Sequence, residues 1–448
     1  NLNNVTINKS GGTASVSTPL TLAGNLTRTM GNLDMEGNDL SIAGDITHTA
    51  GSLTLSAGGS LILNGSAAQS NINLNNAIIQ SLELDNVNGA SLTNTAAFTW
   101  SGDLSLTAGS LSMANLGQTI AGSVTGAGSL VAPSSSSLMV SGANWSPAGF
   151  TEGSGTVIFN ATTNMASPTV FHNLSITAPG ALTIDENITV NNTLSGTGSL
   201  TASGSQDITV GGDFTIAGFT AGSSTVLFND GPSTINHPSA SYSFYNLEMA
   251  LGAVANTLTL SEGIAVTNAL TLTQGTLVAG AFTHNIAGDW DSSDPNVTLN
   301  MAGSTIRMTS NGANITTKGT DIFANLTIDY GADILSPISV TGNLLVASVG
   351  AGTLDANSHT IQVGGNVTLT AANATLAAGT STLSLNGTGN QTVNTNNQDW
   401  YNLAIAARTG GTISFTDELN VVNTIAGQGL LIAAGAYNIA INDGGILP

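Results

Sequence analysis

The sequence contains no cysteine among its 448 residues, which excludes disulfide bonds, thiolate metal ligands and thiol nucleophiles. Charged residues make up only 7% of the chain and aromatic residues 4%, and there are only 10 prolines. Five basic residues stand against 26 acidic ones, for a formal net charge of −21. Because nucleic acids and anionic membranes are bound by clustered Lys and Arg, neither partner is expected. No stretch approaches the roughly 18 consecutive apolar residues of a membrane span, so no membrane insertion is expected either.

The sequence is rich in one short pattern, in which apolar residues alternate with Thr, Ser or Asn and are closed by Gly or Asn. Such alternation is typical of half-buried β-strands, and Gly and Asn are typical of turns. The first version of the pattern begins at Asn4, Ser81, Asn173, Asn246, Asn325 and Asn402. The second has Gly before Asp45, Ser123, Asp213, Asp289 and Asn366. The third lies at Ser60, Thr156, Thr225, Thr305 and Thr382.

These three landmarks return in the same order about every 78 residues, and the smallest common step is about 20 residues. The short step is visible where residues 22–27 are answered by residues 42–47. A period of about 20 residues with tight turns predicts one coil of a parallel β-solenoid, whose coils must stack to bury their apolar side chains. The predicted fold is therefore all-β, a single elongated parallel β-helix of about 22 coils.

The whole chain, 1–448, is predicted to be one continuous solenoid. Its repeats are expected at residues 1–80, 81–171, 172–244, 245–323, 324–400 and 401–448, with one extra coil in the second and a partial last repeat. The alternative is a tandem array of immunoglobulin-like β-sandwiches, because such a domain has a similar length. That fold requires linkers and unlike strands, whereas these repeats are self-similar and their composition does not change at the boundaries.

Both ends of the sequence carry strand patterns with no amphipathic helix beyond them. Uncapped solenoid ends favour head-to-tail contacts between copies of the chain. The candidate contact residues are Val5, Ile7, Ile439, Ile441, Ile446 and Leu447. The chain begins without Met or a basic region, so we expect a secreted product whose signal has been removed, located outside the cell or on its surface.

One acidic turn is the candidate metal site. Asp289, Asp291 and Asp294 place three carboxylates within six residues, a set of oxygen ligands that could hold Ca²⁺. The spacing lacks the Gly and terminal Glu of an EF-hand, so a solvated turn is the competing interpretation. No other cofactor is expected. The paired carboxylates that hydrolysis of polysaccharides requires are also not evident, and we do not expect an enzyme.

Two other residue types recur with the repeats. Aromatic residues at the first landmark, such as Phe244, Phe323 and Trp400, are expected to fill one corner of successive coils. Asn residues at the landmarks match the spelling of glycosylation sites. We interpret them instead as a turn ladder, in which side-chain amides bond along the stack.

Residues 325–328, 352–354 and 359–366 together resemble the degenerate repeats of large secreted bacterial surface proteins and adhesins with β-solenoid stalks. The resemblance covers the whole chain, but its motifs are low in complexity. It implies an extracellular structural protein that forms a fibre or stalk with itself. The alternatives are an adhesin that binds glycans or cell surfaces through loops or Thr-rich faces and, third, a polysaccharide-degrading β-helix enzyme.

Overall fold

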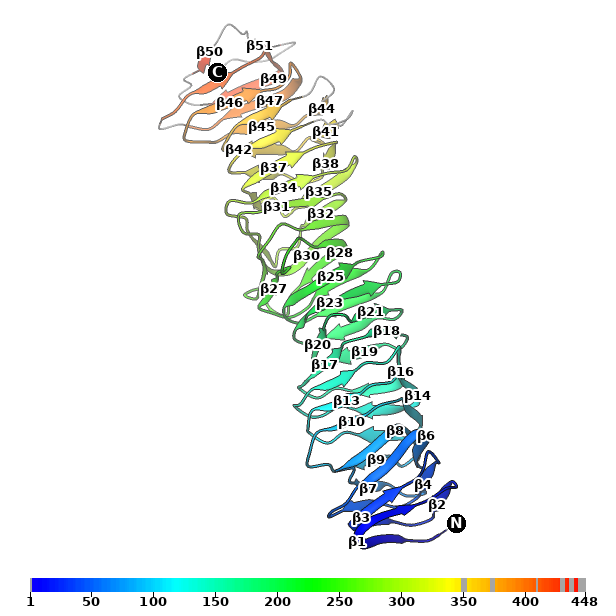
Figure 1. Cartoon of the computed structure of the whole chain (residues 1–448). Coiled ribbons are helices and arrows are strands. Elements are labelled where there is room, and N and C mark those ends of the chain that lie inside the picture. Colours follow the sequence, from blue (N-terminus) through cyan, green and yellow to red (C-terminus); the bar gives the residue numbers. More distant parts are fainter. Residues whose placement is uncertain are drawn as a thin grey trace. The chain divides into compact units, whose positions relative to one another are not determined.

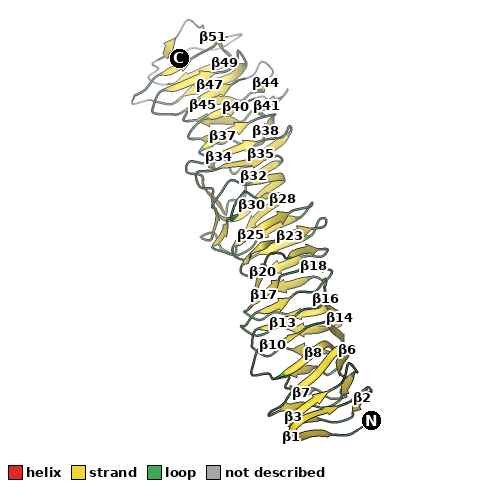
Figure 2. Cartoon of the chain, viewed as in Figure 1, coloured by secondary structure: helices red, strands yellow, loops and turns green. Residues whose placement is uncertain are grey.

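The computed structural model describes residues 2–347, 353–370, 375–407, 410–427, 432–434 and 439–441. It is an all-β parallel β-solenoid of about 21 turns, with rungs of about 20 residues. Strands β1 to β51 follow one another with no helix among the described residues (Figure 1, Figure 2). In that part of the chain there is accordingly no helix long and apolar enough to cross a membrane. The predicted solenoid is confirmed, and the immunoglobulin-like alternative, which needs antiparallel sheets, is wrong.

The Cα packing divides the chain into an N-terminal unit, Asn1–Gly222, and a C-terminal unit, Ser223–Pro448. Each turn of the N-terminal unit winds over three sides. In some turns each side has its own short strand, and in others one long strand, such as β3 (Leu26–Asp34), covers two sides. One turn consists of β17 (Thr156–Phe159), β18 (Thr162–Met165) and β19 (Thr169–Phe171). The next consists of β20 (Asn173–Ile176), β21 (Ala181–Ile184) and β22 (Ile188–Val190). Each strand pairs in parallel with its counterpart, so the turns lie in register.

The C-terminal unit has the same three-sided arrangement. Side 1 holds β31 (Thr283–Ile286), β34 (Thr305–Met308), β37 (Asn325–Ile328), β40 (Leu344–Val346) and β43 (Val367–Leu369). Side 2 holds β32 (Asp289–Ser292), β35 (Ala313–Thr317), β38 (Ala332–Ile334), β41 (Thr353–Asp355) and β44 (Thr375–Ala377). Side 3 holds β36 (Ile322–Phe323), β39 (Ile338–Val340), β42 (Thr360–Val363) and β45 (Thr382–Leu385). The chain visits the sides in the order 3, 1, 2.

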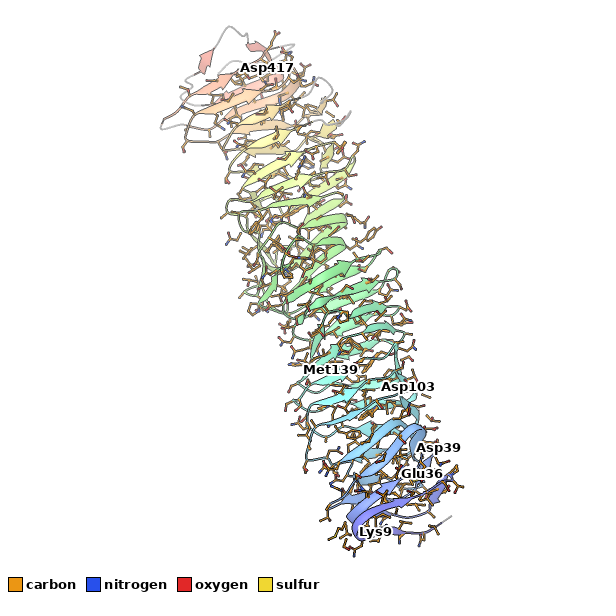
Figure 3. The ribbon with its side chains drawn as sticks, viewed as in Figure 1. Lys9, Glu36, Asp39, Asp103, Met139 and Asp417 are labelled. Carbon is orange, nitrogen blue, oxygen red and sulfur yellow. The ribbon has the colours of Figure 1, made fainter. Side chains whose placement is uncertain are left out.

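The core is a narrow column of apolar side chains inside the coil. In β20 the alternation leaves Leu174 and Ile176 buried and turns Asn173 and Ser175 outward, as period-two patterning requires. The outward side chains cover each unit with short polar groups (Figure 3). Each coil buries only a few apolar residues, so its stability depends on the turns above and below it.

The three landmarks of the sequence are stacking positions. In the C-terminal unit the third landmark lies directly beneath the first landmark of the next repeat, because Thr305 pairs with Asn325 and Thr382 pairs with Asn402. The first and second landmarks share a side and are two turns apart. Asn325 precedes Leu326, which aligns with Leu344 and then with Val367, the residue after Asn366.

A repeat does not contain a whole number of turns. From Asn325 the chain makes two turns on side 1 to Asn366, advances past side 2 to Thr382 on side 3, and completes one more turn to Asn402. One repeat therefore contains about three and two-thirds turns. The first landmark therefore moves by one side in each repeat, and Asn246, Asn325 and Asn402 lie on sides 2, 1 and 3.

Candidate functional site

Side-chain oxygens link successive rungs of the N-terminal unit at its corners. Asn4 Oδ1 accepts a hydrogen bond from the backbone N–H of Asn25 (2.7 Å), and Asn25 Oδ1 accepts one from that of Asp45 (2.8 Å). Asp103, labelled in Figure 3, accepts from the N–H of Ser123 in the same way (2.8 Å). Each bond supplies an acceptor to a turn N–H that no strand partner reaches.

The C-terminal unit repeats this arrangement. Asn325 Oδ1 accepts from the N–H of Asn343 (3.0 Å), Asn343 Oδ1 from Asn366 (2.9 Å), and Asn366 Oδ1 from Thr392 (2.8 Å). The interpretation of the landmark Asn residues as a turn ladder is therefore confirmed at these positions. The bonds run from side chain to backbone, so they fix the distance between turns as well as their register.

The glycine before the ladder residue is a packing requirement. A Cβ atom added to Gly44 would overlap Asn25 Oδ1 and would lie 2.7 Å from the carbonyl oxygen of Gly24. A Cβ atom at Gly24 would likewise overlap Asn4 Oδ1. The pattern of Gly followed by Asn or Asp therefore arises because the side chain of one turn occupies the space where the next would place its Cβ.

Two buried glutamines hold the rungs together where a turn is longer. The ladder step is 20 residues from Asn25 to Asp45 but 26 residues from Asp45 to Asn71. Within the longer step, Gln69 Nε2 donates to the carbonyl oxygens of Gly44 (2.6 Å) and Ile42 (3.0 Å). The Gly44 carbonyl is equivalent in position to the Gly24 carbonyl of the preceding rung. The Gly24 carbonyl accepts a hydrogen bond from the backbone N–H of Gly44. The side chain thus replaces a backbone donor.

Gln391 repeats this device in the C-terminal unit. Its Nε2 donates to the carbonyl oxygens of Gly365 (2.7 Å) and Val363 (3.0 Å), and the ladder step across this turn is again 26 residues. Sequence reasoning missed both glutamines. The available signal was a Gly four residues before each, Gly65 and Gly387, in the two longest intervals between ladder residues.

The acidic turn proposed as a calcium site lies on and just after β32. Asp289 Oδ1 accepts from the N–H and the side-chain amide of Asn314 (2.8 and 3.1 Å). Asp291 and Asp294 each accept from a backbone N–H two residues ahead, at 3.0 and 2.8 Å. No group of three or more His, Asp or Glu that could hold a metal ion occurs in the described part of the chain. The geometry therefore gives the calcium prediction no support.

The candidate polymer contacts fall partly within the described residues. Val5 and Ile7 lie half-buried in β1 (Val5–Ser15), which pairs in parallel with β3 (Leu26–Asp34). Ile439 and Ile441 lie in β51 (Ile439–Ile441), which pairs with β49 (Leu419–Gly427). Ile446 and Leu447 lie outside the described residues.

The aromatic residues of the first landmark are buried, as expected, but they do not share one corner. Phe244 and Phe323 are fully buried. Phe244 stacks under Val266, which pairs with Ile286 on side 1, whereas Phe323 stacks under Val340 on side 3. The expectation of a single corner was wrong because a repeat of three and two-thirds turns shifts each equivalent residue by one side.

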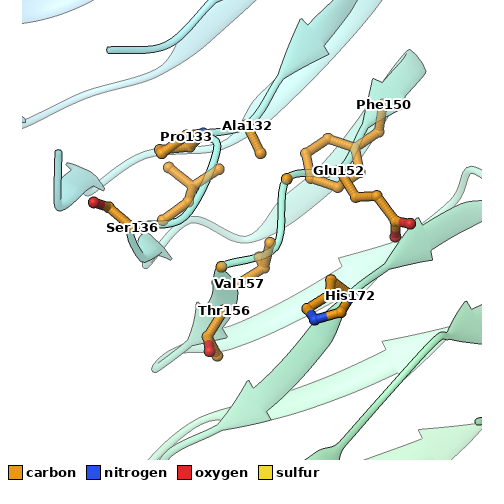
Figure 4. A pocket seen from close by; sticks show the side chains of 11 residues that line it. Ala132, Pro133, Ser136, Phe150, Glu152, Thr156, Val157 and His172 are labelled. Carbon is orange, nitrogen blue, oxygen red and sulfur yellow. The ribbon is translucent and has the colours of Figure 1, made fainter. Parts of the chain in front are cut away.

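A small pocket lies beside β16 (Asn144–Thr151) in the N-terminal unit (Figure 4). It has room for about one water molecule. Glu152 and His172 line the same side of it. Glu152 Oε1 accepts a hydrogen bond from the Asn191 side chain (2.6 Å), a bond that ties together rungs two turns apart. The pocket is too small for a sugar ring or another organic substrate.

Ionisable groups inside the solenoid mostly serve packing. Ser292 Oγ, which accepts from Trp290 Nε1 (3.0 Å), donates to the buried Asp321 carboxylate (2.6 Å). Lys318 Nζ lies 3.6 Å from the same carboxylate. His284 is buried, with Nε2 2.8 Å from the carbonyl of Ala279, and burial lowers the pKa of its imidazole.

Comparisons with known proteins do not assign this chain to a family. Neither the family models, nor the curated proteins, nor the solved structures contain a match to the chain.

Proposed function

We propose that the chain is an extracellular structural protein, a subunit of a surface fibre or stalk that grows by stacking one β-solenoid on the end of another. One observation carries this proposal: the repeat of about three and two-thirds turns places equivalent residues on different sides of the coil in the C-terminal unit. A repeated binding site would be expected to gather on one face. The feature that recurs is the ladder of side-chain hydrogen bonds that joins each turn to the next.

The edge of the first rung supports the same proposal. Along β1, strand pairing within the described residues runs only to β3. The N–H of Val5 donates to Asn25 (2.9 Å), and successive residues of a parallel strand bond to opposite neighbours. Thr6 therefore directs its N–H and carbonyl away from β3. A further rung, supplied by a second copy, can continue the pattern there.

Electron microscopy of the purified chain tests the proposal. We expect filaments whose length rises with protein concentration. Thr6→Pro removes the N–H that points away from β3 and leaves the bond from Val5 to Asn25 in place, so it should shorten or abolish the filaments. Thr6→Ser is the matched control, because it keeps the N–H, and it should assemble like the unmodified chain.

Single particles at every concentration would contradict assembly. If such particles bound an array of glycans, the adhesin function would be supported instead. Turnover of an acidic polysaccharide would support the enzyme.

A further inference from the structure

The first turns of the N-terminal unit enclose an arginine that has no carboxylate partner. Arg28 lies on β3 and is fully buried. The ion pairs found among the described residues are those of Arg307 with Asp329 and Lys318 with Asp321. A chain with 26 acidic residues has thus placed none of its described carboxylates within ion-pair distance of this guanidinium. A buried unpaired charge is strongly unfavourable, so a compensating group is expected.

The hydrogen bonds of Arg28 leave part of the guanidinium unused. Its Nη2 donates to the carbonyl oxygens of Asn73 (2.9 Å) and Asn75 (3.1 Å). Its Nε and Nη1 are buried too, and no partner for either is found in the described structure. Carbonyl oxygens carry only partial charge, so the two bonds orient the guanidinium without neutralising it.

Two more buried nitrogens near this loop lack a partner. His48 is the register partner of Arg28 one turn further along, and its Nδ1 is buried without a hydrogen bond. Asn94 Oδ1 accepts from the N–H of Leu74 (3.2 Å), within the loop that Arg28 binds, while its Nδ2 has no partner. Burial, and then the positive charge of Arg28, lower the pKa of His48, which agrees with the closeness of the two side chains.

Every unsatisfied atom of this group is a nitrogen that can donate a hydrogen bond, and one of the side chains is a cation. A divalent cation would be repelled by that set, whereas an anion would accept from it. We propose that Arg28 and His48 form a buried site for one small inorganic anion of the chloride class. A bulky anion does not fit, because the donors lie inside the coil. The anion fastens the loop at Asn73–Asn75 to the second and third rungs.

Diffraction from crystals of the full chain grown in sodium bromide tests the site directly. We expect an anomalous bromide peak within hydrogen-bonding distance of Arg28 Nε or Nη1. A peak without anomalous signal at that place would identify a water molecule and overturn the proposal. No peak at all would overturn it equally.

Thermal unfolding provides a second test in solution. At constant ionic strength, replacing sodium gluconate by sodium chloride should raise Tm by roughly 2–4 °C, and the rise should follow the logarithm of the chloride concentration once this exceeds the dissociation constant, as ligand binding to the folded state predicts. Arg28→Met should remove the chloride-dependent rise in Tm. Arg307→Met removes an exposed charge in the C-terminal unit and should keep it.

An unchanged chloride response in Arg28→Met would overturn the proposal. If that variant does not fold, the bromide diffraction and the chloride titration of the unmodified chain still decide the question. Neither test depends on whether the chain forms filaments.

Discussion

Phe244 and Phe323 are the last residues of successive repeats, each two residues before a landmark Asn, yet they stack on different sides of the solenoid. Phe244 lies under Val266 on side 1 and Phe323 under Val340 on side 3. The sequence repeat and the coil therefore have different periods. Any property that follows the repeat is distributed around the C-terminal unit rather than along one face.

Replacing Gln69 by Ala should destabilise the N-terminal unit. The substitution leaves the Gly44 carbonyl without the side-chain donor at 2.6 Å, and a buried unsatisfied polar group costs about 1–3 kcal/mol. Urea unfolding followed by circular dichroism measures the loss. Gln362→Ala is the control, because Gln362 is exposed on β42 and accepts one bond from Asn386 (3.2 Å). Equal losses in the two variants would refute the role assigned to Gln69.

The ladder predicts a contrast between two substitutions of Asn343. Asn343→Ala removes the acceptor of the Asn366 N–H, with an expected loss of about 0.5–1.5 kcal/mol. Asn343→Asp keeps an acceptor oxygen in the same place and should stay close to the unmodified chain at neutral pH. Hydrogen exchange of the Asn366 backbone amide reports directly on this hydrogen bond, and fast exchange is expected in the Ala variant alone. Comparable exchange in both variants would show that the side-chain oxygen does not protect this amide.

Gly44→Ala should be far more damaging than an alanine in open space. The new methyl group would overlap Asn25 Oδ1 on the preceding rung, and overpacking of this kind typically costs about 1–3 kcal/mol. Gly11→Ala is the matched control, since nothing lies within 4 Å of its added Cβ. Thermal unfolding of the two variants gives the comparison. A Gly44→Ala protein as stable as the control would mean that the rungs can separate at little cost.

His284 makes the stability of the C-terminal unit depend on pH. Burial lowers the pKa of its imidazole below the ordinary value of 6.5. As the pH falls below about 6.5, the unfolded chain takes up a proton that the folded chain does not, so stability is lost. The contribution is fully present above that pH. Urea unfolding between pH 8 and pH 5 should show a shallower decline for His284→Gln than for the unmodified chain. Parallel profiles would contradict the assignment.

The coil itself could be predicted from the sequence because its cause is local. Alternation of Leu174 and Ile176 with polar neighbours sets the strand, and the Gly and Asx residues at about 20-residue intervals set the turn. The ladder at Asn25 and Asp45 followed from the same reasoning, since an Asx side chain at a tight turn has a backbone donor within reach.

What could not be predicted depends on stacking over longer distances. The position of Phe323 on side 3 follows from the sum of all turn lengths before it, so small differences between turns decide it. The role of Gln69 depends on a carbonyl 25 residues earlier in the chain. The lack of a carboxylate beside Arg28 is also invisible in the sequence, because Asp and Glu are abundant nearby and only the fold shows which of them turn away.

The two glutamine turns suggest a practical use for the molecule. At Gln69 and Gln391 the chain bulges by several residues, while the side-chain amide donates a hydrogen bond to a glycine carbonyl of the preceding rung. A foreign peptide grafted between Gly65 and Gln69, or between Gly387 and Gln391, would leave that hydrogen bond in place. These turns are therefore natural display points, where cargo can be mounted on a repetitive scaffold without disturbing its winding.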